Sequence, residues 1–280
     1  MFKNILFPVK KTEKVSRVLE MARFLRMFDT EKIILLNVGK NNGKDRVTNL
    51  KRIKEALENE SYNTELIFRQ GHVPSQIVRA GIETDASFIS LPWKRKNPIR
   101  RAIMGNVTSD VIRLSNQPVL VHKSPKTVSA GNELNTVLYA TGLMSTDIKI
   151  LRYLTYRGLR ARNLILLHVG ERAPDPVAEE DRIKRVYGSM AGIEEKCTDH
   201  FDHIEKIEAV AGSVSTQIAR KSSRKGAGLI IIGKVDDHRP FEKMTGSVAE
   251  SLPEKANCPV MIIPGVYRGM EDKPEEEKDQ

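Results

Sequence analysis

Cysteine, aromatic residues and long apolar runs are all scarce in this chain of 280 residues. The two cysteines, Cys197 and Cys258, form no Cys-x-x-Cys spacing, so the sequence indicates neither a disulfide framework nor a structural zinc site. Apolar runs such as 164–167 and 229–232 are far shorter than the ~18–20 residues that cross a membrane. The N-terminus has no signal-peptide pattern. These absences predict a cytoplasmic protein with no membrane span and no bound metal.

Motifs for common catalytic chemistry are missing as well. The chain contains no Gly-x-Ser-x-Gly elbow, no assignable Ser–His–Asp set and no full Walker pattern. His200 and His203, with Asp199 and Asp202, meet no structural zinc spacing, and a solvated helix end is the favoured interpretation. We therefore name no catalytic base or nucleophile.

The charge is unevenly distributed along the chain. Residues 1–124 contain 23 Lys and Arg against 12 Asp and Glu, a net charge of +11, whereas residues 125–280 contain 23 against 24, a net charge of −1. A basic half could attract nucleic acid or an anionic surface, but no nucleic-acid motif accompanies the charge. We favour a basic solvated surface over either partner.

A long internal repeat is the strongest positive feature. Gln-Pro-Val-Leu-Val at 117–121 and Cys-Pro-Val-Met-Ile at 258–262 are 141 positions apart, whereas Val-Gly at 38–39 and at 169–170 are 131 apart. The second copy has therefore gained about ten residues in its second helix or the loop before it. A repeat of this length indicates a duplicated domain. We expect domain 1 at 1–124, a linker at 125–133, domain 2 at 134–266 and a charged, disordered tail at 267–280.

Each copy alternates short apolar runs with longer segments of helical period, a pattern typical of βαβ units. We predict an α/β fold of two tandem doubly wound domains, each a five-stranded parallel sheet with helices on both faces. The expected strands are 4–9, 32–38, 65–69, 87–92 and 118–122, then 136–141, 163–169, 204–210, 229–233 and 259–264. The expected helices are 13–27, 44–59, 73–83 and 105–114, then 146–160, 175–198, 214–224 and 246–256.

An open parallel sheet leaves a crevice at the carboxyl ends of its strands, where the strand order reverses. The first and fourth strands of each copy should line that crevice, together with the loop that follows the fourth strand. In copy two, this loop leads to a helix that opens on Gly246-Ser247. Glycine permits close approach of a phosphate, and the free N–H groups and helix dipole favour an anion. An ordinary glycine-and-cap helix start is the alternative.

These motifs and their order resemble the universal stress protein family in a tandem arrangement that covers almost the whole chain. The late signature of that family is Gly, two residues, Gly, nine residues and Gly-Ser or Gly-Thr, followed by a Cys-Pro-Val strand. Copy two has Gly233, Asp236, Gly246 and Ser247 at the fixed positions, and its Leu-His-Val at 167–169 matches the second strand of the family. The resemblance implies an adenine nucleotide alpha hydrolase-like fold, in which last-strand edges commonly pair between domains.

The resemblance also implies a nucleotide site in copy two, since members with the late signature use it to hold ATP or AMP. Gly246 and Ser247 would hold phosphates, and Gly233 would allow the ligand to approach. Gly142 replaces an acidic residue of the family, and Asp236 would add negative charge near the phosphates. The implied nucleotide-binding residues are Ala140, Thr141, Gly142, Val169, Gly233, Lys234, Gly246, Ser247 and Val248.

Copy one departs further from the signature. Lys10 stands at the acidic position, and the proline at the first signature glycine removes an N–H donor. The basic loop that follows either captures an anion or is simply solvated on a degenerate domain, and we favour the second interpretation. The candidate anion-binding residues are Lys10, Lys94, Arg95, Gly105 and Asn106.

The sequence thus favours a tandem universal stress protein, a stress-response or regulatory module that binds ATP or AMP mainly in domain 2. The alternative is a nucleotide-independent interaction scaffold whose domains form a pseudo-dimer, with a protein partner or a second copy of the chain. We expect no enzyme activity, although slow ATP hydrolysis stays open.

Overall fold

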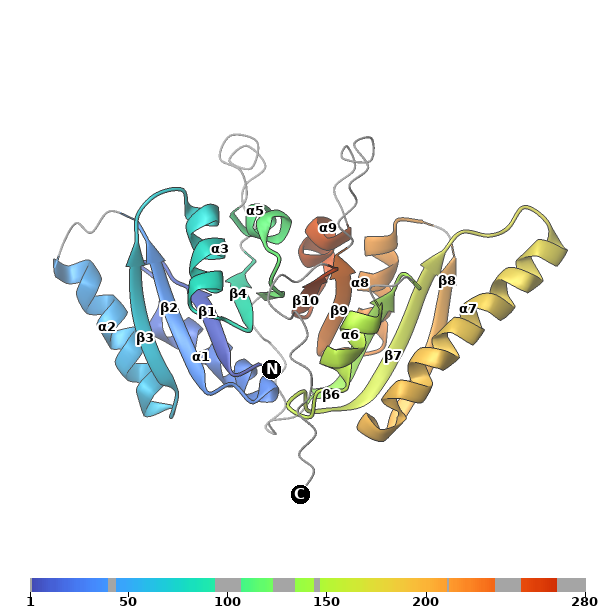
Figure 1. The fold of residues 1–280 in the computed structure, drawn as a ribbon, viewed down its shortest axis with the longest axis horizontal. Coiled ribbons are helices and arrows are strands. Elements are labelled where there is room, and N and C mark those ends of the chain that lie inside the picture. Colours follow the sequence, from blue (N-terminus) through green and yellow to red (C-terminus); the bar gives the residue numbers. More distant parts are fainter. Residues whose placement is uncertain are drawn as a thin grey trace, which may run out of the picture.

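The computed structural model describes residues 2–39, 44–93, 107–122, 134–143, 147–210, 212–234 and 248–265, with the side chains of 44–46 left out. Within these residues, two copies of one α/β arrangement lie side by side (Figure 1). Among the described helices, none combines the length and the apolar character that a membrane crossing requires.

Copy one contains five strands and four α-helices among the described residues. The strands are β1 (Asn4–Pro8), β2 (Lys32–Val38), β3 (Asn63–Arg69), β4 (Phe88–Pro92) and β5 (Val119–His122). The helices are α1 (Val15–Leu25), the 3₁₀ turn η1 (Arg26–Phe28), α2 (Lys44–Asn59), α3 (Val73–Glu83) and α5 (Val107–Leu114).

Copy two repeats this order in its described part. Its strands are β6 (Leu134–Thr141), β7 (Ala161–Gly170), β8 (His203–Val210), β9 (Leu229–Lys234) and β10 (Val260–Pro264). Its helices are α6 (Asp147–Leu154), α7 (Pro176–Cys197), the 3₁₀ turn η2 (Thr198–His200), α8 (Val214–Arg224) and α9 (Val248–Lys255).

The ten strands form one continuous sheet in the order β3-β2-β1-β4-β5-β10-β9-β6-β7-β8. Within each copy all strand pairs are parallel, which confirms the predicted pair of doubly wound five-stranded sheets. The last strands of the two copies pair antiparallel, with Leu120 opposite Met261 and Val121 opposite Val260. The last-strand pairing that the resemblance implied is therefore present within this single chain.

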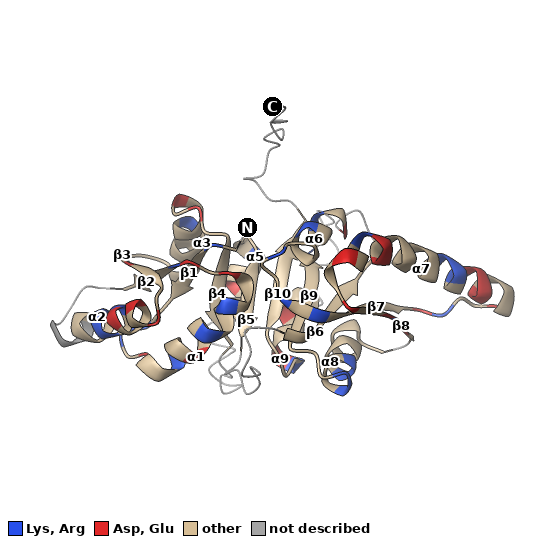
Figure 2. Ribbon diagram, turned by 90° about the horizontal axis from the view of Figure 1, so that it is seen from below, with Lys and Arg blue, Asp and Glu red and all other residues tan. Residues whose placement is uncertain are grey.

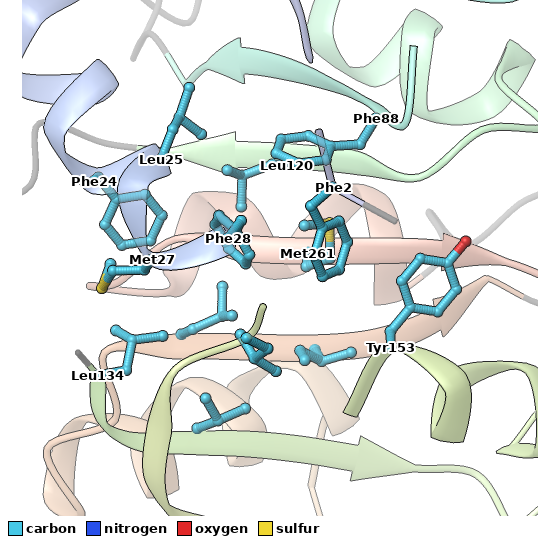
Figure 3. Close-up of a cluster of buried hydrophobic side chains, with 14 of the residues drawn as sticks. Phe2, Phe24, Leu25, Met27, Phe28, Phe88, Leu120, Leu134, Tyr153 and Met261 are labelled. Carbon is cyan, nitrogen blue, oxygen red and sulfur yellow. The ribbon is translucent and has the colours of Figure 1, made fainter. Parts of the chain in front are cut away.

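Alternating strand side chains divide the core between the two faces of the sheet. Helices α1, α2, α6 and α7 cover one face, and α3, α5, α8 and α9 cover the other. On the first face the core runs from copy one into copy two without a break (Figure 3). The rings of Phe2 and Tyr153 lie 5.6 Å apart, and the N–H of Arg160 donates to the carbonyl of Met27 at 3.2 Å. The two copies are consequently one packed body.

One predicted detail differs from the structure, and another is confirmed in part. The helix expected at 146–160 ends at Leu154, because the Thr155 hydroxyl donates to the Leu151 carbonyl and the chain then turns, with Leu159 N–H on the Tyr156 carbonyl. Most of the extra residues of copy two lie in its second helix, one of the two predicted places. Helix α7 has 22 residues where α2 has 16.

Candidate functional site

The switch point of copy two, where the crevice is expected, lies where β6 separates β9 from β7. Ala140 pairs with Ile232 of β9 on one side and with Leu167 of β7 on the other. This register brings the carboxyl ends of three strands, and with them Thr141, Val169 and Gly233, to one edge of the sheet. Gly142 follows β6 directly, Lys234 ends β9, and α9 begins at Val248. Gly246, Ser247 and Asp236 lie outside the described residues.

The hydroxyl of Thr141 is engaged within the protein. It donates to Asp147 Oδ2 at 2.8 Å and accepts from the Leu143 N–H at 2.9 Å. Asp147 is buried in the first turn of α6, and its other oxygen accepts from the hydroxyl of Tyr139. Burial, together with the negative charge of Asp147, raises the pKa of Tyr139 far above its ordinary value. The hydroxyl of Thr141 is therefore committed to contacts within the protein.

Asp147 is a residue that the sequence reasoning missed. It lies six positions after Thr141, where an acidic residue at a helix start signals interaction with free N–H groups. Both of its oxygens accept hydrogen bonds from neighbouring side chains. Asp147 thus fixes the connection from β6 to α6, and it does not take the place of the family's acidic residue, which is Gly142 here.

The second strand of each copy anchors the end of the first strand with a polar side chain. His168 Nδ1 lies 3.1 Å from the carbonyl oxygen of Thr141. At the equivalent place in copy one, Asn37 Nδ2 donates to the Val9 carbonyl at 2.8 Å. This contact has survived the duplication although the side chain differs, so it positions the crevice in both copies.

Lys234 directs its side chain toward copy one. Its Nζ donates to the Arg113 carbonyl at 2.8 Å and to the Ser115 carbonyl at 3.3 Å, at the carboxyl end of α5. A cation there satisfies carbonyl groups that lack helical partners and complements the helix dipole. Because its side chain points to copy one, Lys234 faces the strand ends of copy two with its main chain only.

In copy one, Lys10 is exposed immediately after β1 and Val9. Lys94, Arg95, Gly105 and Asn106 lie outside the described residues. Pro92 ends β4 and pairs with His122 of β5, and both flank the equivalent crevice. Burial, with the nearby charge of Arg17 as a lesser cause, lowers the pKa of His122 to about 3, so this imidazole is neutral.

Metal ligation finds no support among the described residues. No three His, Cys, Asp or Glu side chains gather there in a group that could hold an ion. Cys197 is buried, and burial raises the pKa of its thiol to about 11. Cys258 packs against the core beneath α8 and α9.

Comparison with known proteins decides the family. The model of the universal stress protein family matches residues 40–123 and 134–264, which together exceed half of the chain. The chain belongs to the universal stress protein family. Each copy contributes one match, in agreement with the duplication seen in the sequence and in the sheet.

Related proteins show the same architecture. A universal stress protein from Archaeoglobus fulgidus, 19% identical, superimposes with a TM-score of 0.68 over 95% of this chain and 100% of that chain. A solved structure from Pseudomonas aeruginosa, 16% identical, gives a TM-score of 0.69 over 94% of this chain and 93% of that chain. A universal stress protein of Methanocaldococcus jannaschii is 24% identical over 155 residues, which is 44% of this chain and 96% of that protein. That relative has about the length of one copy.

Proposed function

We propose that this universal stress protein binds an adenine nucleotide, ATP or AMP, in a second domain of residues 134–266 that follows a first domain of residues 1–124. The observation that carries the proposal is the retained signature in the switch-point crevice of copy two. Gly233 precedes the end of β9 by one residue, and Gly246-Ser247 directly precedes the first residue of α9. A helix start of this composition at a topological switch point favours a phosphate group.

The proposed roles follow from the strand ends. Ala140, Thr141 and Val169 border the base, and Gly142 and Gly233 leave room for the ligand to approach the main chain. Lys234 and Val248 flank the phosphate loop with their backbone. Gly246 and Ser247 hold phosphates through N–H groups and the hydroxyl. With Gly142 at the acidic position, the ribose loses one carboxylate partner, so binding depends on the phosphate end.

Isothermal titration calorimetry with ATP and with AMP tests the proposal. The wild type should bind, and Gly246→Val should weaken binding at least tenfold, because a branched side chain blocks the close approach of a phosphate. Gly105→Val makes the same change at the equivalent position of copy one and should leave the affinity within twofold. Absence of binding by the wild type would refute the proposal, and equal losses in both variants would refute the assignment to copy two.

A nucleotide-independent scaffold is the second candidate, and the continuous sheet and core favour it. Lys10, Pro92, Gly142 and Asp236 all depart from the family's binding pattern. Native mass spectrometry of the purified protein separates the two functions. A scaffold carries no nucleotide at any concentration of added ATP or AMP, whereas the first candidate gives a saturable adduct.

A further inference from the structure

A second basic site lies on the helical face of copy two, away from the strand ends. Helices α8 and α9 border a shallow, open groove of about 450 Å³. The groove is lined by Thr216, Ala219, Arg220, Ser223, Arg224, Lys255 and Asn257. None of the proposed nucleotide-binding residues is among them.

Hydrogen-bond donors dominate this lining, and no carboxylate belongs to it. Arg220 and Arg224 are one helical turn apart on α8, a helix that contains no acidic residue (Figure 2). Arg220 donates to the neutral amide oxygen of Gln217 at 2.6 Å. In the described part of the chain, neither these arginines nor Lys255 forms an ion pair. Within the lining, no carboxylate therefore pairs with these cations.

Lys255 is held over the groove by hydroxyl groups. Its Nζ lies 2.7 Å from Ser215 Oγ and 2.9 Å from Thr216 Oγ1. Ser215 is only 3% exposed, so the protein positions the ammonium group from a buried residue. Hydroxyls can rotate to donate to an incoming oxyanion, which gives the groove neutral donors beside its charges.

Copy one shows that the fold does not require these cations. At the positions of Ser223, Arg224 and Lys255, copy one has Ile82, Glu83 and Leu114. Its remaining arginine is neutralised, because Arg79 Nε donates to Glu83 at 2.6 Å. Ile82 and Leu114 are 63% and 48% exposed. The equivalent surface of copy one thus presents apolar side chains and a paired arginine, whereas the groove of copy two is lined by cations.

We propose that the α8–α9 groove of copy two binds the phosphate group of a small phosphorylated ligand. Guanidinium groups match the oxygens of phosphate with paired donors, and a lysine adds a point charge. The groove is open to solvent, so it suits contact with a phosphate group and does not bury a whole ligand. No aromatic side chain lines the groove to stack on bases, which disfavours single-stranded nucleic acid as its occupant.

Titration of the full-length protein with inorganic pyrophosphate at 0.15 M salt, followed by calorimetry, tests this inference. Saturable binding is expected in the wild type. The triple variant Ser223→Ile, Arg224→Glu, Lys255→Leu installs the copy-one residues and should weaken binding at least tenfold. Lys196→Glu on α7, which covers the opposite face of the sheet, makes a charge reversal away from the groove and should stay within twofold, since distant charges are largely screened at this salt.

Further variants separate this site from the nucleotide site and from misfolding. Gly246→Val disables the proposed nucleotide crevice, so the pyrophosphate that this variant still binds reports the groove. Adding the triple groove change to Gly246→Val should abolish that remaining binding, and no binding by Gly246→Val alone would overturn the inference. Lys255→Met makes a smaller change and should weaken binding severalfold with an unchanged circular dichroism spectrum. Wild-type affinity in both groove variants would overturn the inference, as would failure of the wild type to bind pyrophosphate. Binding of a labelled oligonucleotide without competition by pyrophosphate would overturn it too.

Discussion

At the scale of the residue, buried polar groups make the stability of the protein depend on pH. His122 is 4% exposed, and its pKa of about 3 lies below the value of ~6.5 for an imidazole in an unfolded chain. As the pH falls below 6.5, this imidazole binds a proton in the unfolded chain but stays neutral in the folded protein. The stability associated with a neutral His122 is therefore present above pH 6.5 and is lost progressively toward pH 3.

His122→Phe should reduce this pH dependence while it retains the ring contact with Phe7, whose centroid is 6.0 Å away. Between pH 7 and pH 5, the wild type should lose about 2 kcal/mol more unfolding free energy than the variant. Urea denaturation at several pH values measures both curves. Parallel curves would show that His122 is protonated without cost in the folded state.

Tyr139→Phe should destabilise the protein by roughly 1–3 kcal/mol, because it removes a donor from the buried Asp147 carboxylate. Tyr187→Phe is the matched control on α7, where the side chain is 39% exposed, and it should change stability by less than about 0.5 kcal/mol. Chemical denaturation of both variants gives the comparison. Equal stability of the two would mean that the Tyr139 hydroxyl contributes nothing.

The sequence predicted where the strands of copy two end but not how their last side chains are engaged. Strand ends follow from hydrophobic period and turn residues, so the positions of Ala140, Val169 and Gly233 could be derived. The partners of Thr141 and Lys234 depend on contacts made by packing, Asp147 in one case and the distant carbonyls of α5 in the other. Spacing along a sequence carries no information on a contact across 121 residues.

At the scale of the element, most helices and strands were predictable because the apolar residues of each recur with one clear period. The exception is the helix expected at 146–160, which ends at Leu154, just before the weak helix formers Thr155, Tyr156 and Gly158. Helix propensity alone predicts a helix end poorly when the chain must turn to contact another element. Here that segment meets η1, through Arg160 N–H and the Met27 carbonyl.

Helix α5 provides a prediction at this scale. Lys234→Met keeps the length of the side chain but removes the cation that binds the last carbonyls of α5. The variant should lose about 0.5–1 kcal/mol of stability, as expected for a charge at a helix end. Hydrogen exchange should show faster opening of α5 than in the wild type. Unchanged exchange in α5 would contradict the capping role.

At the scale of the whole molecule, the shared core predicts that both copies unfold together. Phe2 lies against Phe28 and Phe88 of copy one and against Tyr153 and Tyr156 of copy two. Phe2→Ala should therefore cost about 3–5 kcal/mol and lower the stability of both copies.

Two natural probes report the copies separately. The fluorescence of Trp93 follows copy one, and labelling of the buried thiol of Cys197 follows copy two. Their transitions in urea should coincide in the wild type and shift together in Phe2→Ala. Separate midpoints would mean that the copies unfold independently.

The pairing of β5 with β10 has a consequence for how such a chain can change (Figure 1). In a dimer of identical subunits, every mutation occurs twice, once on each side of the symmetry axis. In a fused chain the two halves are encoded by separate parts of the gene, so a mutation changes one half alone. One half can then acquire Arg224 and Lys255 while the other keeps Glu83 and Leu114, and natural selection can act on either surface without altering its counterpart.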